Sequence, residues 1–170
     1  MNSPLPSVSE TPAKKRTLVP RDAATLIVVD RSSDAAAVKE PRILMGHRSG
    51  KHVFMPNTFV FPGGRLDPED VGIPAHGDLR APVMQRLQRK ASARKARALA
   101  CAAIRETFEE TGLIIGAPHN GNYAASKVTP DWEPFFATGI APRLDCLDYV
   151  ARAVTPPNNC LLYTSDAADD

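Results

Sequence analysis

The chain has 170 residues, of which 43% are hydrophobic and 24% are charged, so it is long enough for one domain with a buried core. Its formal net charge of +2 is too small to predict nucleic-acid binding on its own. The three cysteines form no Cys-x-x-Cys pair, which argues against a zinc site or a disulfide framework and favours a reducing compartment.

The first 22 residues are rich in proline and serine and include the basic cluster Lys14-Lys15-Arg16. Because this composition can bury little apolar surface, we predict a flexible tail over 1–22. The tail lacks the apolar core of a signal peptide, and no run of 18 apolar residues follows it. We therefore expect a cytoplasmic protein with no membrane partner and no specific nucleic-acid partner, while its oligomeric state stays open.

Three strands are predicted in the first third of the chain. Residues 24–30 are rich in β-branched side chains, and 42–48 form a second strand that is a candidate to pair with the first. Residues 58–60 predict a third strand that enters a tight turn at Gly63 and Gly64. The loop before the third strand carries cations that either contact substrate phosphates or are ordinary loop residues: His47, Arg48, Lys51 and His52.

Two helices are predicted after a loop at 65–78 that is punctuated by glycine and proline. Residues 79–90 predict a short helix, and an alanine-rich segment predicts a long helix over 93–111. Ser92 is the expected N-cap of the long helix. Gly112 is expected to end it, because a residue without a Cβ is favoured at that position.

After the long helix we predict a strand at 113–116, a loop to 127, a short helix around 131–136 and another strand at 149–154. Residues 160–170 neither continue this pattern nor close a fold, and they resemble the translated end of a sequencing adapter. We expect this segment to be non-native, and the natural domain to continue beyond the start of it.

The long helix carries three carboxylates on one face. Glu106, Glu109 and Glu110 stand at spacings i, i+3 and i+4, whereas Ile104 and Phe108 point the opposite way. Like charges at these spacings repel each other, and a divalent cation such as Mg²⁺, which prefers oxygen ligands, would remove the conflict. The alternative interpretation is a solvated acidic face that binds nothing.

Around this face the sequence resembles the Nudix hydrolases. Their signature is Gly, five residues, Glu, seven residues and then Arg-Glu-(apolar)-x-Glu-Glu-x-Gly-(apolar). Residues 105–113 match the second half, with Thr107 at an apolar position; Gly64 and Asp70 match the first half, with Asp in place of Glu. The two halves are separated by 34 residues instead of seven, which predicts an insertion at about 71–96. Similar insertions occur in a subgroup that includes coenzyme A diphosphatases.

The resemblance implies an α/β protein, a Nudix-type α/β/α sandwich with a mixed sheet over 23–159 that is truncated at its C-terminal end. It implies Mg²⁺ or Mn²⁺ held by the three glutamates and the Gly64 carbonyl. The glutamates and Arg105 are the implied catalytic residues. Arg105 would orient the glutamates by ion pairing, and one glutamate or a residue in a later loop would act as the base. Asp70, one methylene shorter than Glu, is expected to reach this network less well.

The implied reaction is hydrolysis of a diphosphate linkage in a small nucleoside diphosphate-x substrate, with coenzyme A or an acyl-CoA as one candidate. Arg48-Ser49 match part of a motif of the coenzyme A enzymes, whereas Val53 and Asn57 depart from it. The implied substrate-binding residues are Arg48, Lys51 and Gly63. The basic insertion would lie beside the site and hold the 3′-phosphate of coenzyme A, or form a solvated basic cap. The alternatives are a hydrolase of ADP-ribose or oxidised nucleotides, and a Nudix-fold binding module without turnover.

Overall fold

The structure, a computed structural model, describes residues 21–31, 41–50, 56–119 and 128–154. The predictions for residues 1–20 and 160–170 lie outside the described residues, as does the substrate-binding role predicted for Lys51. No helix in the described ranges is long and apolar enough to cross a membrane.

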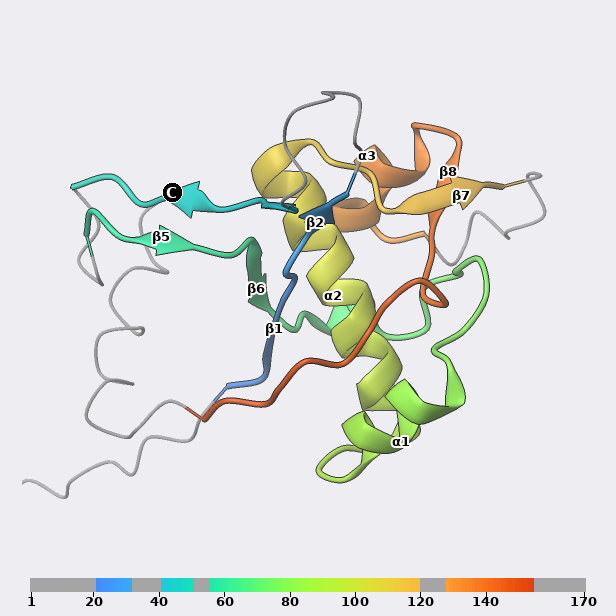
Figure 1. The fold of residues 1–170 in the computed structure, drawn as a ribbon. Helices are drawn as coiled ribbons and strands as arrows, with labels where there is room; N and C mark the ends of the chain where they lie inside the picture. Colours follow the sequence, from blue (N-terminus) through green and yellow to red (C-terminus); the bar gives the residue numbers. More distant parts are fainter. Residues whose placement is uncertain (1–20, 32–40, 51–55, 120–127, 155–170) are drawn as a thin grey trace, which may run out of the picture.

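Helix α2 (Ala93–Thr111) runs through the middle of the molecule (Figure 1). At its start the Lys95 backbone N–H donates a hydrogen bond of 3.3 Å to the Ser92 hydroxyl. At its end Gly112 adopts a φ of 72°, a left-handed conformation that glycine reaches without strain. Both predicted ends of this helix are confirmed, because each signal acts within one turn of the sequence.

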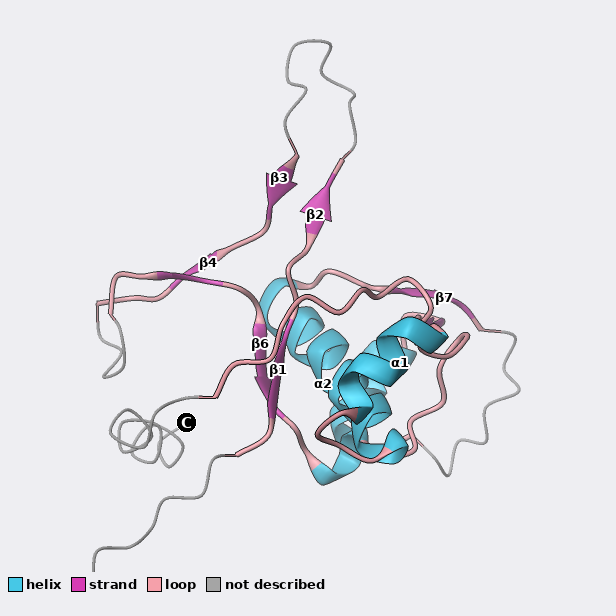
Figure 2. Ribbon diagram, turned by 60° about the horizontal axis from the view of Figure 1, so that its bottom comes forward, coloured by secondary structure: helices cyan, strands magenta, loops and turns pink. Residues whose placement is uncertain are grey.

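Short strands are paired two by two around α2. The bounds are β1 (Ala23–Thr25), β2 (Val29–Asp30), β3 (Arg42–Ile43), β4 (Gly46–His47), β5 (Phe59–Val60), β6 (Gly63–Arg65), β7 (Gly116–Pro118) and β8 (Ile140–Pro142). Among the described residues these strands form the antiparallel pairs β1–β6, β2–β3, β4–β5 and β7–β8 rather than one continuous mixed sheet. The β1–β6 pair contacts α2, whereas β2–β3 and β4–β5 extend away from it (Figure 2).

The predicted strand at 24–30 is present in two parts. Its first part, β1, pairs with β6, and its second part, β2, pairs with β3 through Val29 opposite Ile43. The chain changes partner between the two parts, so the strand is interrupted there. The predicted pairing of the first two strands is confirmed.

Shorter helices contact α2 along its length. Helix α1 (Ala81–Gln88) packs on the N-terminal part of α2, and the 3₁₀ turn η3 (Pro130–Trp132) leads into α3 (Glu133–Phe136), which lies near its C-terminal part (Figure 1). These confirm the helices predicted at 79–90 and 131–136. The predicted loop at 65–78 contains a 3₁₀ turn, η1 (Pro68–Asp70), that the sequence did not indicate.

Three strand predictions need correction. Gly63 and Gly64 lie inside β6, after a bend at Pro62, rather than in a tight turn. The strand predicted at 113–116 begins only at Gly116, within a segment predicted to be loop. The segment 149–154 pairs with no described strand, and Val150 is 70% exposed, because the alternation of apolar residues there meets no partner.

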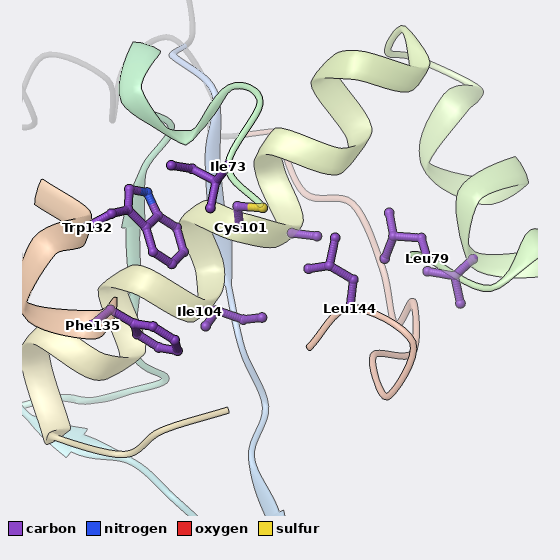
Figure 3. Close-up of a cluster of buried hydrophobic side chains, with 9 residues drawn as sticks. Ile73, Leu79, Cys101, Ile104, Trp132, Phe135 and Leu144 are labelled. Carbon is purple, nitrogen blue, oxygen red and sulfur yellow. The ribbon is translucent and has the colours of Figure 1, made fainter. Parts of the chain in front are cut away.

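The core gathers on one side of α2, where Cys101 and Ile104 are fully buried (Figure 3). Trp132 and Phe135 pack here edge to face, with ring centroids 5.4 Å apart, and Phe135 packs on Phe108 of α2 in the same way at 5.2 Å. These contacts fix the roll of α2 about its own axis. The glutamates of α2 are therefore turned away from the core, as their spacing predicted.

Candidate active site

The glutamates of α2 face the paired glycines of β6. The Gly63 backbone N–H donates a hydrogen bond of 3.0 Å to Glu110 Oε2. A Cβ at Gly64 would collide with the carboxylate of Glu106, so only glycine lets the two groups come this close. The structure thus brings the two halves of the motif together, although they lie far apart in the sequence.

Arg105 is buried beneath the carboxylates and bonded to several of them. Its Nη1 lies 3.1 Å from both carboxylate oxygens of Glu109 and 3.1 Å from Glu106 Oε1. Its Nη2 also donates to the Arg65 carbonyl at 3.1 Å. Burial alone would lower the pKa of Arg105, but hydrogen bonds and charge interactions with Asp70 and Glu109 raise it, so it stays cationic. The predicted ion pairing with Arg105 is present for Glu106 and Glu109.

Asp70 holds the other side of the Arg105 guanidinium. Arg105 Nε donates to Asp70 Oδ1 at 2.9 Å, and Nη2 donates to Oδ2 at 3.1 Å. The expectation that this shorter side chain reaches the network less well is wrong. The 3₁₀ turn η1 presents it, and a capping box, in which the Asp67 N–H donates to Asp70 Oδ2 at 2.8 Å, fixes its direction.

A further partner of Asp70 comes from a distant part of the chain. The Trp132 indole N–H donates to Asp70 Oδ1 at 3.1 Å, and both side chains are fully buried. Sequence reasoning placed a short helix here near the site but gave Trp132 no role. The available signal was that a buried indole N–H needs an acceptor, which in a sequence alone has no identifiable partner.

No family model matches the chain. The acyl-coenzyme A diphosphatase NUDT19 of Xenopus laevis is 31% identical to it over 138 residues, which cover 60% of this chain and 36% of that protein. The crystal structure of a NUDIX hydrolase from Alicyclobacillus acidocaldarius superposes with a TM-score of 0.55 and 27% identity, covering 82% of this chain and 64% of that one. The chain is a homologue of the Nudix hydrolases. It spans less than two thirds of the length of either relative.

The carboxylates near Arg105 outnumber the positive charge of its guanidinium. Asp70, Glu106 and Glu109 contact Arg105, and Glu110 adds a further negative charge on the same face. Burial raises the pKa of Glu106, the charges of Glu109 and Glu110 raise it further, and Arg105 opposes them. Such a group of oxygens matches the ligand preference of a hard divalent cation.

The side chains would have to turn before they could share an ion. Across the described ranges, no three Asp, Glu, His or Cys side chains lie close enough together to hold a metal. The glutamates of α2 do not converge because two of them make other contacts: Glu109 faces Arg105 and Glu110 faces the Gly63 N–H. The chemistry of the donor set fits a divalent metal, and rotation of exposed glutamate side chains is the change that binding requires.

Two other groups predicted to bind substrate, Arg48 and the basic helix of the insertion, lie away from the glutamates of α2. Arg48 follows β4, in the part of the structure that extends away from α2 (Figure 2). Helix α1 packs at the start of α2, and Glu106 follows Ala93 by about 20 Å of helix at 1.5 Å per residue. Arg80 before α1 is paired with Asp148. Helix α1 of the insertion therefore packs on α2 away from the glutamates, and a contact between the insertion and the 3′-phosphate of a substrate stays a prediction.

Proposed function

We propose that this chain carries the catalytic centre of a divalent-metal-dependent hydrolase that cleaves a diphosphate linkage in a nucleoside diphosphate-x substrate. The observation that supports it best is the arrangement of Glu106, Glu109 and Glu110 around Arg105 and the β6 glycines. The buried guanidinium of Arg105 holds Glu106 and Glu109 in fixed positions, which supports an ordered site more than a freely solvated acidic face.

Each residue of the site has its own role in the proposed reaction. Glu106, Glu109 and Glu110 would hold Mg²⁺ or Mn²⁺, together with the Gly64 carbonyl. When bound, the ion would neutralise charge on the phosphoryl oxygens and lower the pKa of its water. Arg105 orients the glutamates, and Gly63, whose N–H donates to Glu110, stays a predicted substrate-binding residue. Water attacks one phosphorus, its proton goes to a base, and the second phosphate leaves.

The proposed substrate class rests on one of the relatives of the chain. The relative from Xenopus laevis is named an acyl-coenzyme A diphosphatase, which favours coenzyme A or an acyl-CoA as the substrate here. Arg48 and Lys51 remain predicted contacts for the substrate phosphates. ADP-ribose and oxidised nucleotides are the competing substrates, because all of these molecules share the diphosphate that the glutamates and metal would bind.

A binding module without turnover is the second candidate. It is favoured by the present conformation, in which Glu109 and Glu110 are held by Arg105 and the Gly63 N–H rather than gathered at one point. In that case the Nudix fold would hold a diphosphate ligand, and the altered first half of the motif, with Asp70, would mark the loss of catalysis.

A substrate screen separates these candidates. The chain would be incubated with coenzyme A, acetyl-CoA or ADP-ribose, with Mn²⁺ or with a chelator, and phosphomonoester products would be measured by chromatography. Our proposal predicts products only with the metal, and faster from the CoA substrates. Binding of coenzyme A by calorimetry without any product would favour the binding module, and products from ADP-ribose alone would reassign the substrate.

A further inference from the structure

Trp132 of η3 contacts the candidate active site through Asp70 of η1. Its indole N–H donates to Asp70 Oδ1 at 3.1 Å, and the same oxygen accepts from Arg105 Nε at 2.9 Å. Its neighbour Asp131 adds a backbone N–H that lies 3.4 Å from Glu69 Oε2. Two consecutive residues of η3 therefore contact two consecutive residues of η1.

The contacts continue from Asp70 to the glutamates. Arg105 receives Asp70 on its Nε and Nη2 side and presents Nη1 to Glu109 at 3.1 Å. A guanidinium is planar, so the direction of the Asp70 carboxylate sets the direction of Nη1. The donors that set Asp70 are the Asp67 N–H, Arg105 itself and the Trp132 indole.

We infer that Trp132 is a positioning residue for the glutamate site. Its indole N–H holds the Asp70 carboxylate in the plane that aligns Arg105, and Arg105 in turn holds Glu109. Without this donor, a buried oxygen of Asp70 keeps only Arg105 as partner, and the guanidinium follows the carboxylate as it turns. This role rests on the proposed function, because it acts on the residues assigned there to the metal.

The competing explanation is that Trp132 only fills the core. It packs edge to face on Phe135 and lies 6.1 Å from Phe136 between ring centroids, so its loss would weaken the fold in any case. A core role and a positioning role differ in one respect. If Trp132 positions the site, its loss weakens metal binding more than an equally destabilising substitution elsewhere in the core does. If Trp132 only fills the core, the two substitutions affect metal binding equally.

The test is the affinity for Mn²⁺, measured by isothermal titration calorimetry on the whole chain. Trp132→Phe keeps a ring in the core but removes the N–H, and we expect about tenfold weaker Mn²⁺ binding, as for other outer-shell partners of metal ligands. Leu79→Ala is the matched control, since Leu79 is buried at the opposite end of the same cluster (Figure 3). It should destabilise the protein at least as much and leave the Mn²⁺ affinity unchanged.

Two results would overturn the inference: unchanged Mn²⁺ affinity in Trp132→Phe, or an equal loss in Leu79→Ala. Glu109→Gln separates this failure from that of the proposed function. If Glu109→Gln binds Mn²⁺ as tightly as the parent, the metal assignment itself falls. If it binds more weakly while Trp132→Phe does not, only the role of Trp132 is wrong.

A second measurement needs no variant of Trp132. The chain has a single tryptophan, so its indole N–H gives one assignable signal in a proton–nitrogen NMR spectrum. Titration with diamagnetic Mg²⁺ should shift this signal, with the midpoint that calorimetry gives for Mg²⁺ binding. The shift should be lost in Glu109→Gln. An indole signal that stays in place while Mg²⁺ binds would contradict the coupling.

Discussion

Asp70 and Arg105 form an ion pair in which both side chains are almost completely buried. Burying two charges is costly, and here the cost is offset by several donors on one carboxylate and by bonds from the guanidinium to Glu109 and to a carbonyl. Removing one partner leaves the other charge buried without compensation. The pair therefore links the stability of the fold to the order of the site.

Asp70→Asn should lower the free energy of unfolding by about 3–5 kcal/mol, because Arg105 keeps its charge and loses its main partner. Urea denaturation followed by circular dichroism measures this loss. The control is Asp30→Asn, which removes the exposed partner of Arg42 and should cost less than about 1 kcal/mol. Equal losses in the two variants would show that the buried pair contributes no more than a surface pair.

A substitution at Gly64 tests whether metal binding requires β6 to lie close to α2. In Gly64→Ala the added methyl group would collide with the Glu106 carboxylate and displace it, so Mn²⁺ affinity should fall by about tenfold or more. Gly46→Ala is the matched control, because a Cβ there meets only Val60, at 3.8 Å or more. Calorimetry on both variants decides, and equal affinities would mean that the position of Glu106 does not matter for the metal.

At the scale of the element, α2 combines a face for the core with a face for chemistry. Its ends and its two faces could be predicted, because capping residues and a 3.6-residue period act within the helix itself. The Asp70–Arg105–Trp132 network could not, since it joins side chains 35 and 62 positions apart. Strand β8 was missed for a related reason. Ile140-Ala141-Pro142 has no alternation, and its pairing with β7 arises only in the folded chain.

Cys101 reports on the packing of α2. Burial raises the pKa of its thiol to about 12, Arg97 lowers it and the carboxylates of Asp70 and Asp78 raise it. Because the thiolate is the reactive form, Cys101 should resist a thiol reagent at pH 8 until the protein unfolds, while the exposed Cys146 should react first. Mass spectrometry of a Cys160→Ser variant identifies the labelled site. Labelling of native Cys101 as fast as Cys146 would contradict its burial.

The raised pKa of Cys101 makes the free energy of unfolding depend on pH in the alkaline range. A thiol whose pKa is raised in the folded state stabilises the fold fully below its unfolded value of 9.0, and this contribution is lost as the pH rises toward about 12. The free energy of unfolding should therefore fall over that range. In Cys101→Ala this part of the fall should be absent, although other groups also titrate there.

At the scale of the whole molecule, the described strands leave apolar surface uncovered. Phe59 is 67% exposed and Ile43 is 52% exposed, both in the strand pairs that extend away from α2 (Figure 2). Exposed apolar side chains on open strand pairs favour association with other strands. We expect the chain to bind a hydrophobic dye and to self-associate with rising concentration.

Phe59→Ser should reduce this self-association, which sedimentation velocity measures at several protein concentrations. Val150→Ser is the control, because Val150 is similarly exposed but lies in a segment that pairs with no described strand. A chain that stays monomeric over the whole concentration range would show that the exposed strand pairs do not act as an association surface.

The central claim is that the carboxylates of α2 perform metal-dependent cleavage of a diphosphate. Its most direct test is the Mn²⁺-dependent rate of coenzyme A hydrolysis by Glu109→Gln and Glu110→Gln, with Glu133→Gln of α3 as the matched exposed control. We predict that each of the first two variants loses at least about 10²-fold in kcat/KM while keeping its helical circular dichroism, and that Glu133→Gln retains the parent rate. A parent that hydrolyses coenzyme A while both α2 variants match its rate would contradict the claim.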